Sequence, residues 1–153
     1  MRVVLDSNVL ARATPGKTSA AREVLLLLAR QPHTLVTAAP LFAELARILQ
    51  YPRVRPLHGL DDAGIQAYLQ AIQLGSAVVS PASPSPVRTR DPADDVVIAA
   101  AVAGRADVIC TWDQHFFDPS VQSACAFHGI RILKDIDLLN ELRRLSSPQA
   151  GTP

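Results

Sequence analysis

The chain has 153 residues, of which 48% are hydrophobic and 19% charged, enough to bury the core of one domain. Its net charge of +1 excludes a uniformly basic nucleic-acid binder, so a nucleic-acid partner would require a local basic patch. The two cysteines, Cys110 and Cys125, lack the spacing of a metal site and fit a reducing compartment. The first apolar run is short and ends in Asp6. We therefore expect a cytoplasmic protein without a signal peptide or membrane span.

Short apolar runs alternate with longer apolar stretches along the chain. The short, β-branched runs predict buried strands. The longer stretches predict helices, with Ser19 and Asp61 before two of them and Gly75 and Gly104 after two. In chain order we expect a strand at residues 3–5, a helix at 20–28, a strand at 34–37, helices at 40–50 and 61–72, a strand at 77–79, a loop at 80–90, a helix at 94–103, strands at 108–110 and 130–133, and a helix at 136–145.

This alternation predicts an α/β fold, a single-domain three-layer α/β/α sandwich around a mostly parallel five-stranded sheet. We expect the domain to span residues 1–145 and residues 146–153 to form a disordered tail. Ligands of such sheets bind beyond the carboxyl ends of the strands.

Acidic residues stand where such a sheet would gather them at one edge. Asp6 ends the first strand and Asp113 follows the fourth. Glu44 lies in the second helix, and Asp94 and Asp95 open the fourth. Carboxylates that converge repel one another unless a proton or a cation is present. The sequence therefore predicts a divalent-metal site, and metal-assisted phosphodiester hydrolysis is the first activity to consider.

Each acid also has a simpler interpretation. Asp6 could form a local turn, and Asp113 could cap a short helix over residues 114–116. Glu44 shares a helical stripe with Leu41 and Leu45, which predicts that its carboxylate points inward, where an unpartnered charge is rare.

The start of the fourth helix leaves two candidates open. Asp91 is interpreted as a cap or turn residue. Asp94 shares a stripe with Val97 and Ile98, while Asp95 shares one with Ile98 and Ala99, so either could face the site.

The other reactive or aromatic side chains are weaker candidates. We interpret most of the four histidines, at positions 33, 58, 115 and 128, as surface or turn residues. His115 is close enough to Asp113 to contact a substrate. Trp112 could stack on a base or pack in the core.

The ordered set of acidic motifs resembles the PIN domain family, and most closely its bacterial branch of toxins from toxin–antitoxin systems. The resemblance extends to about residue 145. The segments that carry it are Asp6-Ser7-Asn8-Val9-Leu10, Leu41-Phe42-Ala43-Glu44-Leu45, Arg90-Asp91-Pro92-Ala93-Asp94-Asp95, and Thr111-Trp112-Asp113.

The resemblance implies a Mg²⁺- or Mn²⁺-dependent endoribonuclease with RNA as substrate. Asp6, Glu44 and Asp113 match the family's acidic positions, and either Asp94 or Asp95 matches the remaining one. Asn8 and Thr111 match polar residues that support the site. The resemblance also implies an antitoxin partner. A homodimer could form through the helices that begin after Ser19 and Asp61.

Three rival functions remain to be weighed. A haloacid-dehalogenase-like phosphatase would need a second aspartate where Asn8 stands. A catalytically silent PIN-like module for RNA binding or interaction would be expected to lack some of the acids. A dinucleotide-binding domain would show a glycine-rich motif after Leu5, and none follows.

Overall fold

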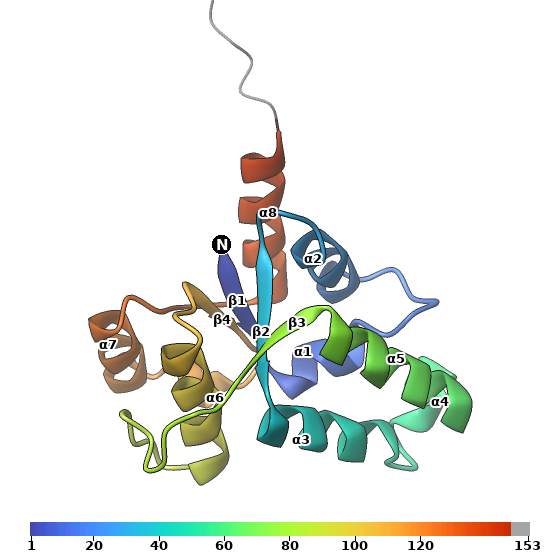
Figure 1. Ribbon diagram of the computed structural model, residues 1–153, viewed down its shortest axis with the longest axis horizontal. Coiled ribbons are helices and arrows are strands. Elements are labelled where there is room, and N and C mark those ends of the chain that lie inside the picture. Colours follow the sequence, from blue (N-terminus) through green and yellow to red (C-terminus); the bar gives the residue numbers. More distant parts are fainter. Residues whose placement is uncertain (148–153) are drawn as a thin grey trace, which may run out of the picture.

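The computed structural model of the protein describes residues 1–147 and has one sheet of five strands, all parallel, in the order β3-β2-β1-β4-β5. Helices cover both faces, as Figure 1 shows. The predicted α/β sandwich is confirmed. The strands are β1 (Arg2–Leu5), β2 (Thr34–Ala38), β3 (Ser76–Val79), β4 (Val108–Cys110) and β5 (Arg131–Leu133). The helices are α1 (Ser7–Arg12), α2 (Ala20–Leu28), α3 (Ala39–Leu49), α4 (Arg55–His58), α5 (Asp62–Leu74), α6 (Pro92–Ala103), α7 (Pro119–Phe127), α8 (Asp135–Ser146) and the 3₁₀ turn η1 (Gln114–Phe117).

The central strands divide the core between two layers because successive residues point to opposite faces. Val3 and Leu5 of β1 pack with α2, α5 and α8, whereas Val4 packs with α6 and α7. Helix α6 is apolar on most of its surface and largely buried. Gly104 ends α6 without a left-handed conformation; its small size matters because a Cβ there would collide with Val36 of β2.

Three short helices were not predicted, α1, α4 and α7. Helices α1 and α4 have six and four residues, too few for a visible hydrophobic period. Helix α7 is rich in small polar residues, and only Cys125 of it is buried. Of the four histidines, His58 is buried, whereas His33 is half-buried and His115 and His128 are exposed. The Nε2 of His58 lies 2.9 Å from the carbonyl of Leu49, and its Nδ1 accepts from the amide of Leu60.

The tail was predicted to begin at residue 146, but α8 includes Ser146. The part of the predicted tail from residue 148 onward lies outside the described residues. Both cysteines are buried and free, and burial raises the pKa of both thiols, that of Cys125 to about 11. No helix within residues 1–147 has the length and apolar character that crossing a membrane requires.

Candidate functional site

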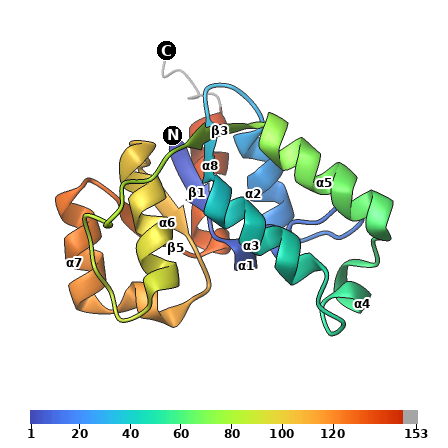
Figure 2. The same ribbon diagram turned by 60° about the horizontal axis from the view of Figure 1, so that its bottom comes forward.

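The order of the strands in the sheet reverses beside β1. This reversal places a crevice at the carboxyl ends of β1 and β4. The chain moves from β1 outward through β2 and β3, then returns to add β4 on the other side of β1. Leu5 pairs with Cys110, so Asp6 and Thr111 follow at the same level. Figure 2 turns this edge toward the viewer, with α1, α3 and α6 nearby. Ligands of parallel α/β sheets bind at such a reversal point.

Asp6 is the most tightly held carboxylate of this edge. It caps α1, where its Oδ1 accepts from the amide of Ser7 at 2.8 Å. Its Oδ2 accepts from the Thr111 hydroxyl at 2.7 Å and from Nδ2 of Asn8 at 3.0 Å. Burial raises the pKa of Asp6 despite these hydrogen bonds, and the nearby charges of Glu44 and Asp113 raise it further. The turn interpretation is therefore correct in part, since Asp6 also lies among other acids.

Glu44 reaches the same edge from α3. It is linked to Asp6 by Ser7, a residue that was not predicted from the sequence to belong to the site. The Ser7 hydroxyl lies 2.9 Å from Oε2 of Glu44 and 3.4 Å from Oδ1 of Asp6, so it joins the two carboxylates. The expectation that Glu44 is fully inward is wrong, because its side chain is 31% exposed and Arg47 lies 4.0 Å away. Ser7 could have been found from the sequence only by assuming a helix directly after Asp6.

Asp94 and Asp113 form the second part of the acidic edge. Asp94 is only 7% exposed, and no hydrogen bond or ion pair to its carboxylate occurs within residues 1–147. Burial raises its pKa to about 6, with further contributions from Asp113, Asp91 and Asp6. Asp113 caps η1 by accepting from the amide of His115 at 3.0 Å, as its capping interpretation predicted.

The carboxylate of Asp95, unlike that of Asp94, contacts the segment that precedes α6. Its Oδ1 accepts from the amide of Thr89 at 2.6 Å, and its Oδ2 lies 3.5 Å from Nε of Arg88. These contacts fasten the segment before α6 to the first turn of that helix. Asp91 caps α6 by accepting from the amide of Ala93, as predicted.

The two supporting residues, Asn8 and Thr111, link the ends of β1 and β4. Asn8 accepts from the amide of Trp112 at 3.2 Å while it donates to Asp6. Thr111 accepts from the amide of Asp113 at 3.0 Å while it donates to Asp6. One network of side chains therefore sets the position of Asp6 relative to Asp113.

The donor set suits a divalent cation. Asp94, Asp113 and His115 each offer one ligand atom, and these three atoms all lie within 4.8 Å of one another. Among residues 1–147, these three residues form the group that could hold a metal ion. Asp6 and Glu44 lie beside this group but are not part of it. A buried carboxylate without a partner next to two other acids is unfavourable unless a cation joins it. The residues present thus fit a site for Mg²⁺ or Mn²⁺.

Hollows flank the acids on both sides. One, of about 160 Å³, is lined by Arg88, Arg90, Asp94 and His115 among others. The other, of about 400 Å³, is lined by Asn8, Arg12 and Lys17 among others. Basic side chains thus line both hollows, together with the acids Asp94 and Asp118 in the first and Asp135 in the second.

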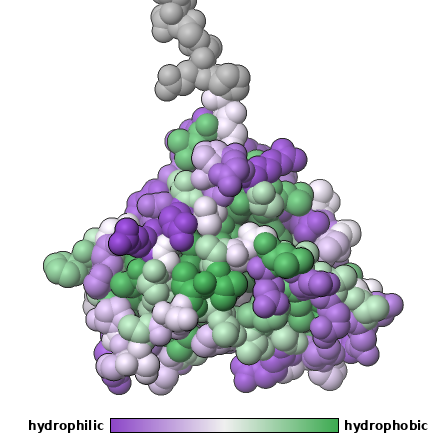
Figure 3. All heavy atoms as spheres, viewed as in Figure 1, coloured by the Kyte–Doolittle hydropathy of each residue, from purple (hydrophilic) through white to green (hydrophobic). Residues whose placement is uncertain are grey.

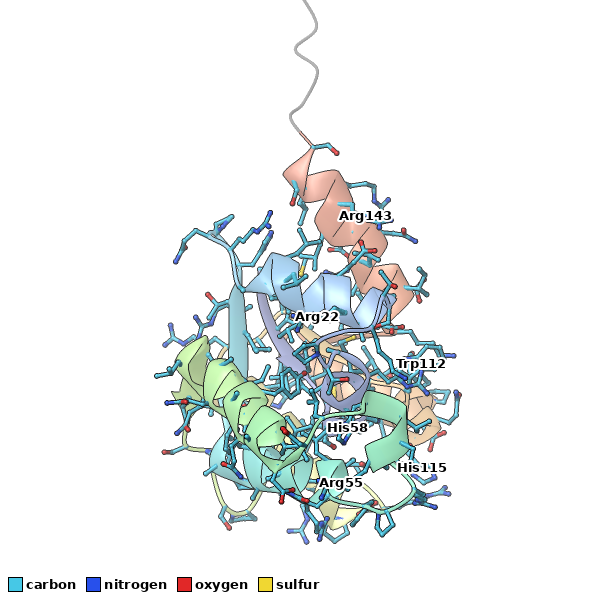
Figure 4. The ribbon with its side chains drawn as sticks, turned by 90° about the vertical axis from the view of Figure 1, so that its right-hand side faces the viewer. Arg22, Arg55, His58, Trp112, His115 and Arg143 are labelled. Carbon is cyan, nitrogen blue, oxygen red and sulfur yellow. The ribbon has the colours of Figure 1, made fainter. Side chains whose placement is uncertain are left out.

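Trp112 lies beside the acids, between two cations. Arg12 lies 4.7 Å and Lys134 5.0 Å from the centre of its half-buried ring. Its Nε1 is buried without a hydrogen-bond partner within residues 1–147. The ring packs against the core cluster of α1 and α8, which favours the packing interpretation over base stacking. Figure 4 shows Trp112 and His115 on the same side of the molecule.

A family model for the PIN domain matches residues 2–115, a span that contains Asp6, Glu44, Asp94 and Asp113. The chain belongs to the PIN domain family. PIN domains are typically nucleases that act on RNA and commonly use divalent metal ions. The acidic edge of this PIN domain offers carboxylates that are compatible with such an ion. No curated protein matches the chain in a sequence comparison.

Proposed function

We propose that this PIN domain is a Mg²⁺- or Mn²⁺-dependent endoribonuclease that hydrolyses RNA phosphodiester bonds. The observation that supports the proposal is the carboxylate of Asp94, which has no hydrogen-bond or ion-pair partner among residues 1–147 and lies among the charges of Asp113 and Asp6. Asp6, Glu44, Asp94 and Asp113 would hold the metal. A bound divalent ion would lower the pKa of an attacking water and offset charge on the phosphate.

The residues around the acids have separate tasks in this proposal. Thr111 and Asn8 hold Asp6 in a fixed orientation, and Ser7 couples it to Glu44. We assign the third acidic position to Asp94 rather than Asp95, because Asp95 is engaged by Thr89 and Arg88. Arginine and lysine side chains in the flanking hollows, including Arg12 and Arg90, would contact the phosphates on either side of the cleaved bond.

A cleavage assay tests this function directly. Purified protein is incubated with a labelled RNA and either Mn²⁺, Mg²⁺ or a chelator. We expect cleavage with metal, none with chelator, and none by Asp6→Asn. Asp137→Asn is the matched control, since Asp137 is an exposed acid in the first turn of α8. Equal cleavage by Asp6→Asn and wild type would contradict the proposal.

The same preparations separate the rival functions. Hydrolysis of a small phosphate ester that is lost in Asp6→Asn would indicate a phosphatase. In the structure, the position where such enzymes need a second aspartate is occupied by Asn8, which donates to Asp6. RNA binding without cleavage under any metal would indicate a silent binding module.

A toxin role and protein partners extend the proposal. Growth arrest on expression, absent for Asp6→Asn, is the outcome expected of a toxin, and normal growth would contradict it. For a homodimer or an antitoxin, the candidate surface is an apolar groove of about 430 Å³ between α2 and α5. Figure 3 shows further apolar residues near the neighbouring edge strand β3, where Val78 is 55% exposed.

A further inference from the structure

One member of the metal-compatible group is an imidazole rather than a carboxylate. We infer that His115 supplies a nitrogen ligand to the bound metal and gives the site a preference for Mn²⁺ over Mg²⁺. The inference rests on the proposed metal site, but it concerns a residue that the acidic motifs do not include. It specifies which ion the site selects.

The η1 turn brings the imidazole to the acids. The amide of His115 donates to Oδ1 of Asp113, and this bond folds the chain back so that Nδ1 lies 3.6 Å from the same oxygen. Ligand atoms of Asp94, Asp113 and His115 all lie within 4.8 Å of one another. The His115 side chain is 69% exposed, so it can rotate the remaining distance without displacing the core.

A second observation is that no positively charged side chain among residues 1–147 forms an ion pair with Asp94. Asp94 as a residue is 7% exposed, and its carboxylate, whose oxygens keep contact with solvent, has no hydrogen bond or ion pair from any described residue. Arg88, which lines a hollow together with Asp94, forms its ion pair with Asp95. Asp94 therefore faces Asp113, Asp6 and Asp91 with His115 as its nearby basic group. A metal bound between Asp94, Asp113 and His115 would satisfy all three.

The ligand chemistry then determines the metal preference. Mg²⁺ favours oxygen ligands and keeps its water shell, whereas imidazole is a good ligand for later first-row ions. Mn²⁺ favours carboxylate oxygens, as Mg²⁺ does, and binds a given donor set more weakly than zinc or copper. As a transition-metal ion it nevertheless gains more from an imidazole nitrogen than Mg²⁺ does. One nitrogen among carboxylate ligands therefore shifts selectivity toward Mn²⁺ while leaving Mg²⁺ able to bind through the oxygens.

Pulsed electron paramagnetic resonance of bound Mn²⁺ tests the inference without any enzymatic readout. The protein carries no histidine tag, and the electron spin-echo modulation from ¹⁴N is recorded after Mn²⁺ titration. We expect imidazole ¹⁴N modulation in wild type and in His128→Gln, the matched control at an exposed histidine. We expect its loss in His115→Gln, with Mn²⁺ still bound through the acids. In that variant, the ratio of the Mn²⁺ affinity to the Mg²⁺ affinity should fall at least about tenfold. This is the lower end of the affinity that a metal site loses when a residue that only supports a metal ligand is removed.

The outcomes separate this inference from the proposed function. Mn²⁺ binding without ¹⁴N modulation in wild type would overturn the role of His115 and leave the nuclease proposal standing. Modulation that persists in His115→Gln would overturn it equally, since His33, His58 or His128 would then be the source. No Mn²⁺ binding at all would overturn both. The wild-type spectrum needs no variant, so a folding defect in His115→Gln would not prevent the test.

Discussion

The Thr111 hydroxyl donates a 2.7 Å hydrogen bond to Oδ2 of Asp6, joining the ends of two neighbouring parallel strands. The contact is buried, and both residues are less than 10% exposed. It fixes the carboxylate at the point where the strand order reverses. Hydrogen bonds to a charged group contribute more than those between neutral groups, because the charge strengthens the attraction.

Removal of this hydroxyl tests its positioning role. We expect Thr111→Val to lower the rate of RNA cleavage about tenfold, equivalent to about 1.4 kcal/mol in the barrier, because Asp6 loses its shortest side-chain donor. The measurement is kcat at saturating Mn²⁺. Thr37→Val, the same change at a buried threonine of β2, is the control. Equal kcat for the two variants would show that the bond does not position Asp6.

Asp94 predicts an unusual pH dependence of the metal-free protein. Folding raises its pKa from 3.8 to about 6, so the folded state holds this proton more tightly than the unfolded state. The contribution of Asp94 to stability is therefore fully present below about pH 4 and is lost as pH rises through about 6. We expect Asp94→Asn to remove part of this decline and to stabilise the chelator-treated protein at pH 7 by about 1 kcal/mol, allowing for solvent screening. Denaturant unfolding at a series of pH values measures it; a less stable variant at pH 7 would contradict it.

Asp95 should behave in the opposite way to Asp94. Asp95→Asn replaces the charged acceptor of the Thr89 amide by a neutral amide oxygen and removes the charge that faces Arg88. We expect Asp95→Asn to lower the free energy of unfolding by about 1–2 kcal/mol while changing Mn²⁺ affinity less than Asp94→Asn does. Calorimetric titration with Mn²⁺ compares the two variants. A larger loss of affinity in Asp95→Asn would make Asp95 the third acid of the site.

Close packing rather than backbone conformation should explain the requirement for Gly104. A Cβ at this position would collide with Val36, which lies in the central strand β2. We expect Gly104→Ala to destabilise the fold by about 1–3 kcal/mol through overpacking. Gly16→Ala is the comparison, because Gly16 has a φ of +86° and no atoms near its missing Cβ, so only about 1 kcal/mol of backbone strain is expected. A smaller effect at Gly104 than at Gly16 would contradict this explanation.

The flanking basic residues should control the salt dependence of RNA binding. Each phosphate contact lowers the slope of log affinity against log salt by about 0.7 for a single strand. We expect Arg12→Gln and Arg90→Gln each to weaken binding and to reduce the steepness of this slope by about that amount. Arg144→Gln, an exposed arginine of α8, is the control. Catalytically silent Asp6→Asn protein permits the measurement without cleavage, and unchanged slopes would place the RNA elsewhere.

Asp6 and Asp113 could be predicted from sequence because their positions depend on chain connectivity alone. Each follows an apolar run, and the carboxyl ends of parallel strands meet at one edge. Thr111 directly follows the fourth strand, so its place at this edge could be predicted for the same reason, whereas Asn8 was indicated by the resemblance to the PIN domain family. The sequence could not decide whether Asp94 or Asp95 faces the site. Because α6 is apolar nearly all round, its hydrophobic pattern does not predict which side of the helix faces the sheet.

The sequence by itself determined the alternation of strands and helices, and with it the edge where the acids gather, because hydrophobic period and strand polarity are local properties. Tertiary structure alone decided that Ser7 joins Asp6 to Glu44, that Asp94 rather than Asp95 faces Asp113, and that His115 reaches the same group. These contacts depend on how helices rotate and pack on the sheet. That rotation is set by the packing of many distant side chains, which no short segment encodes.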